Sequence, residues 1–374
     1  MLPYLGVFFA SSSLIALSEK IKKNQRLFFV ILALALPCIL AGLRANHIGT
    51  DTEVYLMPTI NAATSSHSFS EYLDTSWYRI WRFLSVKDFE RGFTLVVYIT
   101  TKLLGAFWTK FILEMLIIAP TFLAIKKYGK YPAWLGMMVF YLTIYNSTLN
   151  MMRQSVAVAF TLLGILYFIE RNKKGFVTCL LVGCSFHTSG VVLLLITAMF
   201  YFIKPNQQLD TLFSRRVELQ KVALILVLGI ASLFSLGVVS SILKIIGLGS
   251  YVNYFGGTFH FVQNQFLSRF PIMLLMLISW YKWNEGESNA RFFIAMFILE
   301  ILCLQLTSVN VYSGRIAYFF SSVNVLAYPS LCYCRPQKGR RFFMISALLG
   351  YLLFYWWFYY GVQGIDATIP YVMI

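Results

Sequence analysis

Long apolar runs separated by short polar segments dominate this chain of 374 residues. A helix needs about 20 mostly apolar residues to cross the hydrocarbon core of a bilayer, and many of these runs approach that length. The period-two alternation of a membrane β-barrel is missing from them. The pattern therefore predicts an all-α polytopic membrane protein with about twelve transmembrane helices. The apolar segments lie near residues 3–18, 27–43, 108–125, 131–149, 152–169, 175–186, 188–203, 221–247, 270–283, 291–309, 315–332 and 341–361.

A further apolar stretch, at residues 92–106, is short for a transmembrane helix and contains Lys102. We expect a re-entrant or interfacial segment there. The run at 3–18 has no basic residues before it, so we expect it to stay as a membrane helix. Because no detachable soluble domain is visible, residues 1–374 are expected to form a single integral membrane domain.

Composition supports this class and adds an orientation. Hydrophobic residues make up 59% of the chain, charged residues only 12%, and the mean hydropathy is +0.69. The formal net charge of +16 comes mainly from short basic clusters, which all fall on one side of the membrane if 92–106 does not cross. The positive-inside rule makes that side cytoplasmic, so the charge reflects topology and attraction to anionic lipid. Short separate clusters do not form a nucleic-acid surface, and no nucleic-acid partner is expected.

Two longer loops face the other side, at residues 44–91 and 248–268. The first contains EYLDTSWYRIWRFL, in which aromatic residues alternate with arginine. This composition predicts an amphipathic helix lying at the membrane interface, although its rings are also suited to stacking on sugars. The second loop is rich in Tyr, Phe, Asn and Gln, a composition suited to a wall that faces a saccharide.

Ionisable residues gather at the outer ends of the apolar segments. Arg44 and Asp51 follow the second segment, and Glu90 and Arg91 precede the stretch 92–106. Charges near hydrocarbon are costly, so a functional role is the first hypothesis for each of them. Arg44 has an alternative role as an anchor whose side chain reaches lipid headgroups.

Arg153 and Gln154 open an apolar helix from the outside. A positive side chain at a helix N-terminus opposes the helix dipole, so an anionic ligand is one explanation for Arg153. The alternative is an ion pair with Glu90 or Asp51. His187 lies between two apolar half-segments, as a candidate general base or as a helix-packing group. Arg269, Tyr312 and Arg315 take similar outer positions further along the chain.

Several arginines without a cluster of metal ligands suggest binding of a lipid pyrophosphate, because the planar guanidinium donates paired hydrogen bonds to phosphate. The sequence has no HExxH, P-loop, GxSxG or DxD motif, which argues against a zinc protease, an ATPase and a serine hydrolase. We expect no metal and no cofactor.

Five motifs in order resemble those of the EpsG-like family, which includes Wzy-type O-antigen and exopolysaccharide polymerases. They are GLRANHIGTDTEVY, FERGF, MRQSVAVAF, SFHTSG and SGRIAYFF, spread over about residues 25–330. The family's motif positions in this sequence are Arg44, Gly49, Thr50, Asp51, Tyr55, Glu90, Gly92, Arg153, Gln154, His187 and Arg315.

The resemblance implies a multi-pass enzyme of the bacterial inner membrane with GT-C-like architecture and an active site facing the periplasm. Its donor and acceptor would be undecaprenyl-pyrophosphate-linked oligosaccharides, and a separate chain-length regulator is a possible partner. Alternatives are an O-antigen ligase, another lipid-linked-sugar glycosyltransferase, or a flippase.

On this basis we predict three roles for the outer residues. Arg44, Arg153 and Arg315 bind the pyrophosphate. His187 is the first candidate for the base, and Asp51 or Glu90 would orient it, replace it or bind sugar hydroxyls. The remaining predicted substrate-binding residues are Thr50, Tyr55, Arg91, Gln154, Arg269 and Tyr312.

Overall fold

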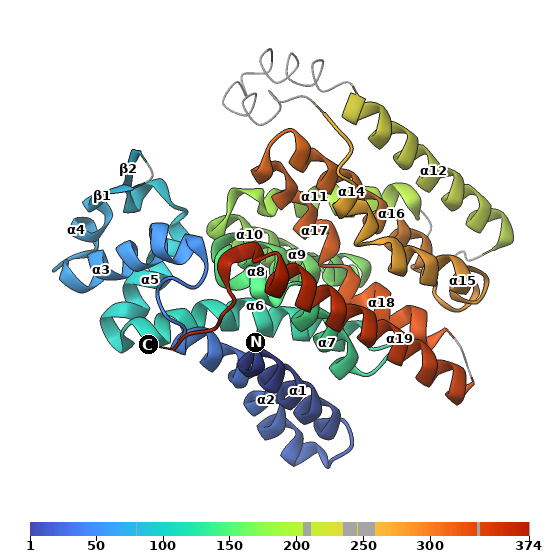
Figure 1. Cartoon of the computed structure of the whole chain (residues 1–374), viewed down its shortest axis with the longest axis horizontal. Helices are drawn as coiled ribbons and strands as arrows, with labels where there is room; N and C mark the ends of the chain where they lie inside the picture. The colour runs from blue at the N-terminus through green and yellow to red at the C-terminus, as the bar shows by residue number, and fades with distance from the viewer. Residues whose placement is uncertain (80, 205–210, 235–244, 246–258, 335–336, 374) are drawn as a thin grey trace. The chain divides into compact units, whose positions relative to one another are not determined.

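The computed structural model describes residues 1–373 except 80, 205–210, 235–244, 246–258 and 335–336. The chain forms two compact units, one of residues 1–193 with 349–374 and one of residues 194–348. In the described parts of both units the elements are helical, apart from one two-stranded sheet. The predicted all-α class is therefore confirmed for these residues, and Figure 1 shows the order of the helices.

Helices of the first unit pack in a chain of neighbours. α2 lies against α1 and α6, and α9 lies against α6 and α10 (Figure 1). The longer helices are α1 (Leu2–Ser18), α2 (Lys23–Leu43), α5 (Arg91–Leu104), α6 (Ala106–Tyr128), α7 (Ala133–Thr143), α9 (Met152–Ile169) and α10 (Lys173–Phe186). The shorter ones are η1 (Thr52–Leu56), α3 (Met57–Ser65), α4 (Phe69–Asp74), η2 (Val86–Asp88), α8 (Tyr145–Asn150), η3 (Thr188–Val191), η7 (Trp357–Val362) and η8 (Ile365–Ala367). Most of α19 (Lys338–Trp356) precedes residue 349, where this unit resumes.

Five helical segments in the described residues are long and apolar enough to cross a membrane. They are Lys23–Leu43, Ala106–Tyr128, Met152–Ile169, Ala290–Ser308 and Lys338–Val362, and shorter apolar helices span Leu2–Ser18, Ala133–Thr143 and Thr188–Ile203. The predicted segment 131–149 is broken, because it divides into α7 and α8, whereas the predicted segment 175–186 lies within α10, an unbroken helix of 14 residues that is about 21 Å long. This is a membrane protein, and the count of twelve spans stays a prediction.

A proline in α2 shows how this fold satisfies backbone groups in an apolar setting. Pro37 has no N–H, so the carbonyl of Ala33, four residues earlier, loses its helical partner. The hydroxyl of Ser11 in α1 donates to that carbonyl at 2.7 Å, and Tyr145 donates to the carbonyl of Pro37 at 2.6 Å. The backbone carbonyls next to this proline are thus bonded to side chains of neighbouring helices, as a membrane interior requires.

Aromatic rings fill the centre of the first unit. Phe8 stacks on Tyr141 with 5.1 Å between ring centroids and meets Tyr145 edge-on at 5.1 Å. Tyr4 and Trp356 join the same cluster at 6.2 Å. These five side chains are all buried, so the cluster packs α1 against α7, α8 and the end of α19.

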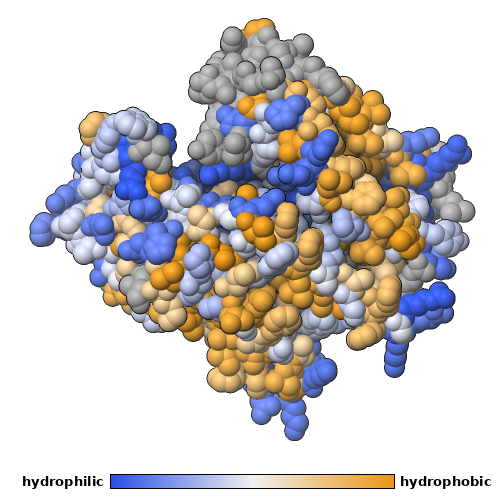
Figure 2. Space-filling model, in the orientation of Figure 1, coloured by the Kyte–Doolittle hydropathy of each residue, from blue (hydrophilic) through white to orange (hydrophobic). Residues whose placement is uncertain are grey.

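The outer face of α2 remains exposed and apolar. Leu27, Phe28 and Ile31 are 66%, 64% and 57% exposed. Figure 2 shows apolar surface over α1 and α2, with hydrophilic residues at the end where the two helices join. This face is suited to lipid contact.

The segment 71–84 is not the amphipathic helix that the sequence predicts. After α4 ends, β1 (Ser76–Arg79) pairs antiparallel with β2 (Arg82–Ser85). Trp77 faces the protein, where its indole donates to the Val54 carbonyl at 3.1 Å and stacks on Phe89, while Tyr78 is exposed. Aromatic residues have high strand propensity, and a half-buried Trp77 next to the exposed Tyr78, Trp81 and Phe83 does not form the apolar face of an amphipathic helix.

The predicted re-entrant or interfacial stretch forms α5, a helix of 14 residues that is about 21 Å long. Its first turn packs directly on the end of α10. A Cβ added at Gly92 would lie 2.4 Å from the Ser185 hydroxyl oxygen and 2.7 Å from the Ser185 carbonyl oxygen. Glycine therefore sets the distance between these two helices.

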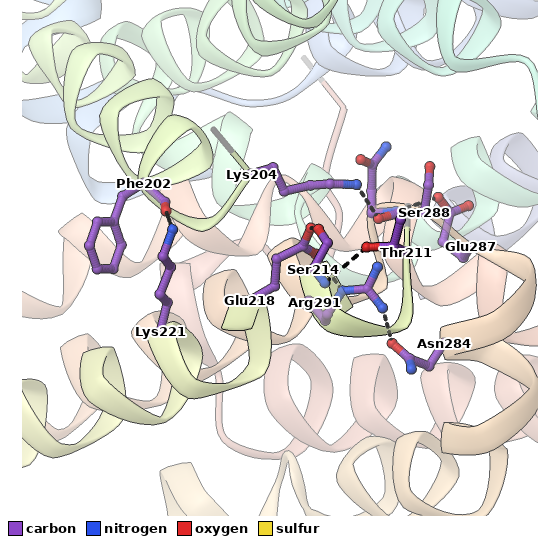
Figure 3. A network of polar contacts seen from close by, with 11 residues as sticks. Phe202, Lys204, Thr211, Ser214, Glu218, Lys221, Asn284, Glu287, Ser288 and Arg291 are labelled. Atoms are coloured by element: carbon purple, nitrogen blue, oxygen red, sulfur yellow. Dashed lines mark hydrogen bonds and ion pairs between the residues drawn. The ribbon is translucent and has the colours of Figure 1, made fainter. Parts of the chain in front are cut away.

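The second unit contains α12 (Leu212–Phe234), α14 (Gln263–Leu267), α15 (Phe270–Gly286), α16 (Ala290–Gln305), α17 (Ala317–Ser321) and α18 (Asn324–Tyr333), with the remainder of α11 (Val192–Ile203) and short turns η5 (Leu306–Ser308) and η6 (Val311–Ile316). Figure 3 shows a buried polar network that joins α12 to α16. Arg291 forms an ion pair with Glu218 at 2.5 Å, and both side chains are under 5% exposed. Asn284 accepts a further hydrogen bond from Arg291.

Removing one partner of this buried ion pair should destabilise the protein. Glu218→Ala leaves the Arg291 guanidinium buried without its carboxylate, and we expect a loss of about 3–5 kcal/mol of unfolding free energy. Replacing both residues by apolar ones, in Glu218→Leu with Arg291→Met, should cost much less. Thermal unfolding of the purified protein in detergent measures both, and a Glu218→Ala variant as stable as the wild type would contradict this account.

Enlarging Gly92 should also destabilise the fold. Gly92→Ala forces α5 away from α10, which we expect to cost about 1–3 kcal/mol. The control is Gly350→Ala in α19, where an added Cβ meets nothing within 4 Å. Equal unfolding temperatures for the two variants would show that the close approach is not required.

Candidate functional site

Four segments of the first unit meet around one arginine. They are residues 49–55, 89–93, 150–153 and 187–189, which contain most of the outer residues singled out in the sequence. Side-chain and backbone contacts hold these four segments together.

Arg153, at the start of α9, forms an ion pair with Glu90, the N-cap residue of α5. Their side chains are 18% and 15% exposed. The second carboxylate oxygen of Glu90 accepts a hydrogen bond from the backbone N–H of Thr188 at 3.2 Å. The predicted alternative of an Arg153–Glu90 ion pair is thus confirmed, and Glu90 joins α9 to the turn after α10.

Aromatic rings hold the guanidinium of Arg153 in place. Its central carbon lies 4.7 Å from the ring centroids of Tyr55 and Phe89 and 5.7 Å from that of Phe93. These cation–π contacts are stronger when the cation is shielded from water. The Nε of Arg153 is buried and has no hydrogen-bond partner among the described residues. The Nε–H of Arg153 thus makes no hydrogen bond within the described part of the chain, while the ion pair and the aromatic rings fix the guanidinium in place.

His187 lies one residue beyond α10, where its extended backbone ends the helix and the turn η3 begins. Its Nδ1 accepts the backbone N–H of Ser189 at 3.2 Å and contacts the Ser189 hydroxyl at 2.5 Å. An N–H can only donate, so Nδ1 is unprotonated and the neutral ring has its proton on Nε2. This tautomer makes His187 a hydrogen-bond donor at Nε2.

Asn150 fixes the turn that carries Thr50 and Asp51. Its Oδ1 accepts from the Thr50 hydroxyl and from the Asp51 backbone N–H, both at 3.0 Å. Gly49 makes the turn possible, because it adopts a φ of +80° and a Cβ there would lie 2.5 Å from the Leu149 carbonyl oxygen. Asp51 is half-buried, and four residues later Tyr55 contacts Arg153.

Arg44 lies inside the protein and not at this surface. It is 1% exposed, donates to the Ala41 carbonyl at 2.7 Å and points Nη2 at the Met152 sulfur at 3.1 Å. Burial lowers the pKa of Arg44, and attraction to Glu114 partly offsets that shift. In this structure the guanidinium is closed off from a ligand, so its predicted pyrophosphate contact is not favoured by the geometry.

Other predicted residues of the first unit occupy different environments. Gln154 is 6% exposed. Arg91 is exposed beside Glu90, and its guanidinium has no partner among the described residues. A free cation next to the Glu90–Arg153 pair adds positive potential where an anion would approach.

The remaining predicted residues belong to the second unit. Arg269 donates to Glu300 at 3.1 Å, and Asn324 donates to the other carboxylate oxygen at 2.6 Å. Arg315 is half-buried in η6. The side chain of Tyr312 lies outside the described residues, as does most of the loop 248–268. Their predicted roles beside Arg153 stay predictions.

Several polar residues here were not singled out from the sequence. Residues 146–150 read Asn-Ser-Thr-Leu-Asn and are all buried between apolar helices. Thr148 donates to Glu114 at 2.8 Å, and Lys110 donates to the Arg44 carbonyl and to Asn46, each at 3.0 Å. A polar run between two apolar segments is a readable signal, because buried polar groups need partners.

Comparison with known proteins adds one finding. A family model described as the EpsG family matches residues 8–373. No curated protein and no solved structure matches the chain. Because the family model covers nearly the whole sequence, the chain belongs to the EpsG family.

Proposed function

We propose that this protein is a glycosyltransferase that polymerises lipid-linked oligosaccharide repeat units. Its substrates would be undecaprenyl-pyrophosphate-linked units, joined at the periplasmic face of a bacterial inner membrane into O-antigen or exopolysaccharide. Family membership supports a polysaccharide polymerase in general terms. The observation that supports the finer proposal is the ring-bound Arg153, which pairs with Glu90 beside His187.

Arg153 would bind the donor pyrophosphate. An arginine has five N–H donors, and the Arg153 side chain is 18% exposed, so it is open to a ligand in a way that the buried Arg44 is not. The aromatic rings around Arg153 shield its guanidinium from water, which strengthens the attraction between the guanidinium and the negative charge that grows on the leaving pyrophosphate. The exposed Arg91 would contribute a second cation.

The transfer step needs a base and a leaving group. The acceptor hydroxyl oxygen forms a bond to the anomeric carbon of the donor sugar, and the bond from that carbon to the phosphate oxygen breaks. The electron pair leaves with the pyrophosphate, and the hydroxyl proton passes to a carboxylate. We assign this base to Asp51, the carboxylate on the turn that Asn150 fixes beside Thr50. Glu90 forms an ion pair with Arg153 and accepts from Thr188, which is consistent with a structural role.

His187 would then act as a donor. Nδ1 accepts from Ser189, so the proton of the neutral ring is on Nε2 and Nδ1 is not available as a base. Donation from Nε2 to a phosphate or sugar oxygen is consistent with this tautomer. His187 would stabilise the departing group in this scheme, and Asp51 would receive the proton.

Two other functions use similar residues. An O-antigen ligase would transfer finished chains to lipid A core. A flippase would place its charges near the bilayer midplane within broken helices. Arg153, Glu90 and His187 lie instead at helix ends, which favours an enzyme over a flippase.

Loss of Arg153 should stop chain growth. In a deletion strain, Arg153→Ala should lower polymer yield by about a hundredfold or more, and Arg153→Lys should restore little because it lacks the planar fork. Silver-stained polysaccharide gels should show core with a single repeat unit. The control Arg340→Ala changes an exposed arginine of the predicted cytoplasmic side and should keep the full ladder.

The same gels separate the alternatives, provided immunoblots show equal protein levels. Core without any repeat unit, with polymer accumulating on carrier lipid, would indicate a ligase. An unchanged ladder in Arg153→Ala would contradict the pyrophosphate role.

Two substitutions at His187 distinguish a donor from a base. Gln offers an N–H near the position of Nε2 but cannot accept a proton at neutral pH, so His187→Gln should keep activity within about tenfold of the wild type. His187→Ala should lose about a hundredfold. Polymerisation rates of purified variants measure both, and equally inactive variants would return the base to His187.

A further inference from the structure

A carboxylate far along the chain lies behind the turn of Asp51. Asp366, in η8, accepts from the Asn150 Nδ2 at 2.9 Å and from the Ser147 hydroxyl at 2.6 Å. It belongs to the first unit, as do the residues it contacts. It was not among the residues that the sequence motifs indicated.

The two ends of the Asn150 amide have different partners. Its oxygen accepts from Thr50 and Asp51, and its nitrogen donates to Asp366. A carboxylate can only accept and a backbone N–H can only donate, so the amide has one orientation that satisfies all these contacts. The negative charge of Asp366 also strengthens the bond from Asn150.

The backbone around Asp366 indicates that its position is enforced. Asp366 has a φ of +66° and Ala367 a φ of +50°, in the left-handed region that costs energy for residues other than glycine. Neighbouring contacts hold this conformation: Gly49 donates to the Ala367 carbonyl at 3.1 Å, and Tyr4 donates to the Thr368 carbonyl at 2.8 Å. Strain of this kind persists where surrounding structure over-determines it, and it gathers at functional sites.

We infer that Asp366 is a positioning residue, which orients the Thr50–Asp51 turn through the amide of Asn150. The inference rests on the proposed function, in which Asp51 receives the proton of the acceptor hydroxyl. Asp366 itself would touch neither substrate nor the reacting atoms. It would determine where the base is presented and would have little effect on substrate binding.

The test uses substitutions that separate charge, hydrogen bonding and backbone strain. Asp366→Gly accepts the positive φ but removes both hydrogen bonds, whereas Asp366→Asn keeps an acceptor for Asn150 and tolerates this backbone. In purified protein, Asp366→Gly should lower kcat by about tenfold with KM nearly unchanged. Asp366→Asn should stay close to the wild type, as should the control Asp74→Gly at an exposed aspartate.

An exchange of the two side chains provides a rescue. Asn150→Asp alone sets two carboxylates against each other and should lose activity like Asp366→Gly. Combined with Asp366→Asn, the carboxylate at position 150 still accepts from Thr50 and Asp51, and the amide at position 366 donates to it. Activity should return in the double variant. If the exchange stays inactive while Asp366→Asn is active, the relay through Asn150 is wrong.

Hydrogen exchange measures the turn without any activity. The peptide covering Asp51 should exchange faster in Asp366→Gly than in the wild type, because the Asn150 side chain that accepts from the Asp51 N–H is no longer held by Asp366. Asp366→Asn should match the wild type. Unchanged exchange in Asp366→Gly would overturn the positioning role. Faster exchange in a protein whose wild type makes no polymer would leave the positioning role standing and refute the proposed function instead.

Discussion

The site depends on the ion pair between Arg153 and Glu90. A lone arginine shielded from water would be costly, and Glu90 offsets that cost while the rings of Tyr55 and Phe89 fix the guanidinium. Glu90 also reaches the backbone of Thr188, so one carboxylate holds the start of α5, the start of α9 and the turn that carries His187. Loss of either partner would therefore release three segments at once. The close approach at Gly92 is part of the same arrangement, because it brings the start of α5 to the end of α10.

A second constraint acts throughout the first unit: polar groups among apolar helices must find partners within the protein. Ser11 satisfies the carbonyl left open by Pro37, and Asn150 satisfies both the turn at Asp51 and the carboxylate of Asp366. These contacts join residues that lie far apart in the sequence. They turn an apolar helical scaffold into one that presents a few polar groups in fixed orientations.

The apolar pattern predicted the helical class and most helix positions, since hydrophobic runs directly reflect the need to bury or face lipid. The prediction failed at 71–84, because the aromatic and arginine residues there suit both a helix and a hairpin. The contacts of Trp77 with Val54 and Phe89 favour the hairpin, and these are tertiary contacts. Family motifs drew attention to Arg153, Glu90 and His187, and the outer position of Arg153 suggested an ion pair with either Glu90 or Asp51. The burial of Arg44 and the roles of Asn150 and Asp366 depend on tertiary contacts, which local sequence does not encode. The tautomer of His187 likewise depends on one backbone N–H, that of Ser189.

The most direct test of the central claim is a reaction of the purified protein in lipid vesicles with a single lipid-pyrophosphate-linked repeat unit as the sole substrate, followed by mass spectrometry. The account predicts lipid-linked dimers and longer chains, with one polyprenyl pyrophosphate released for each new linkage, and neither product from the Arg153→Ala protein. Products that form only when a different acceptor is supplied, or linkage without release of polyprenyl pyrophosphate, would contradict it.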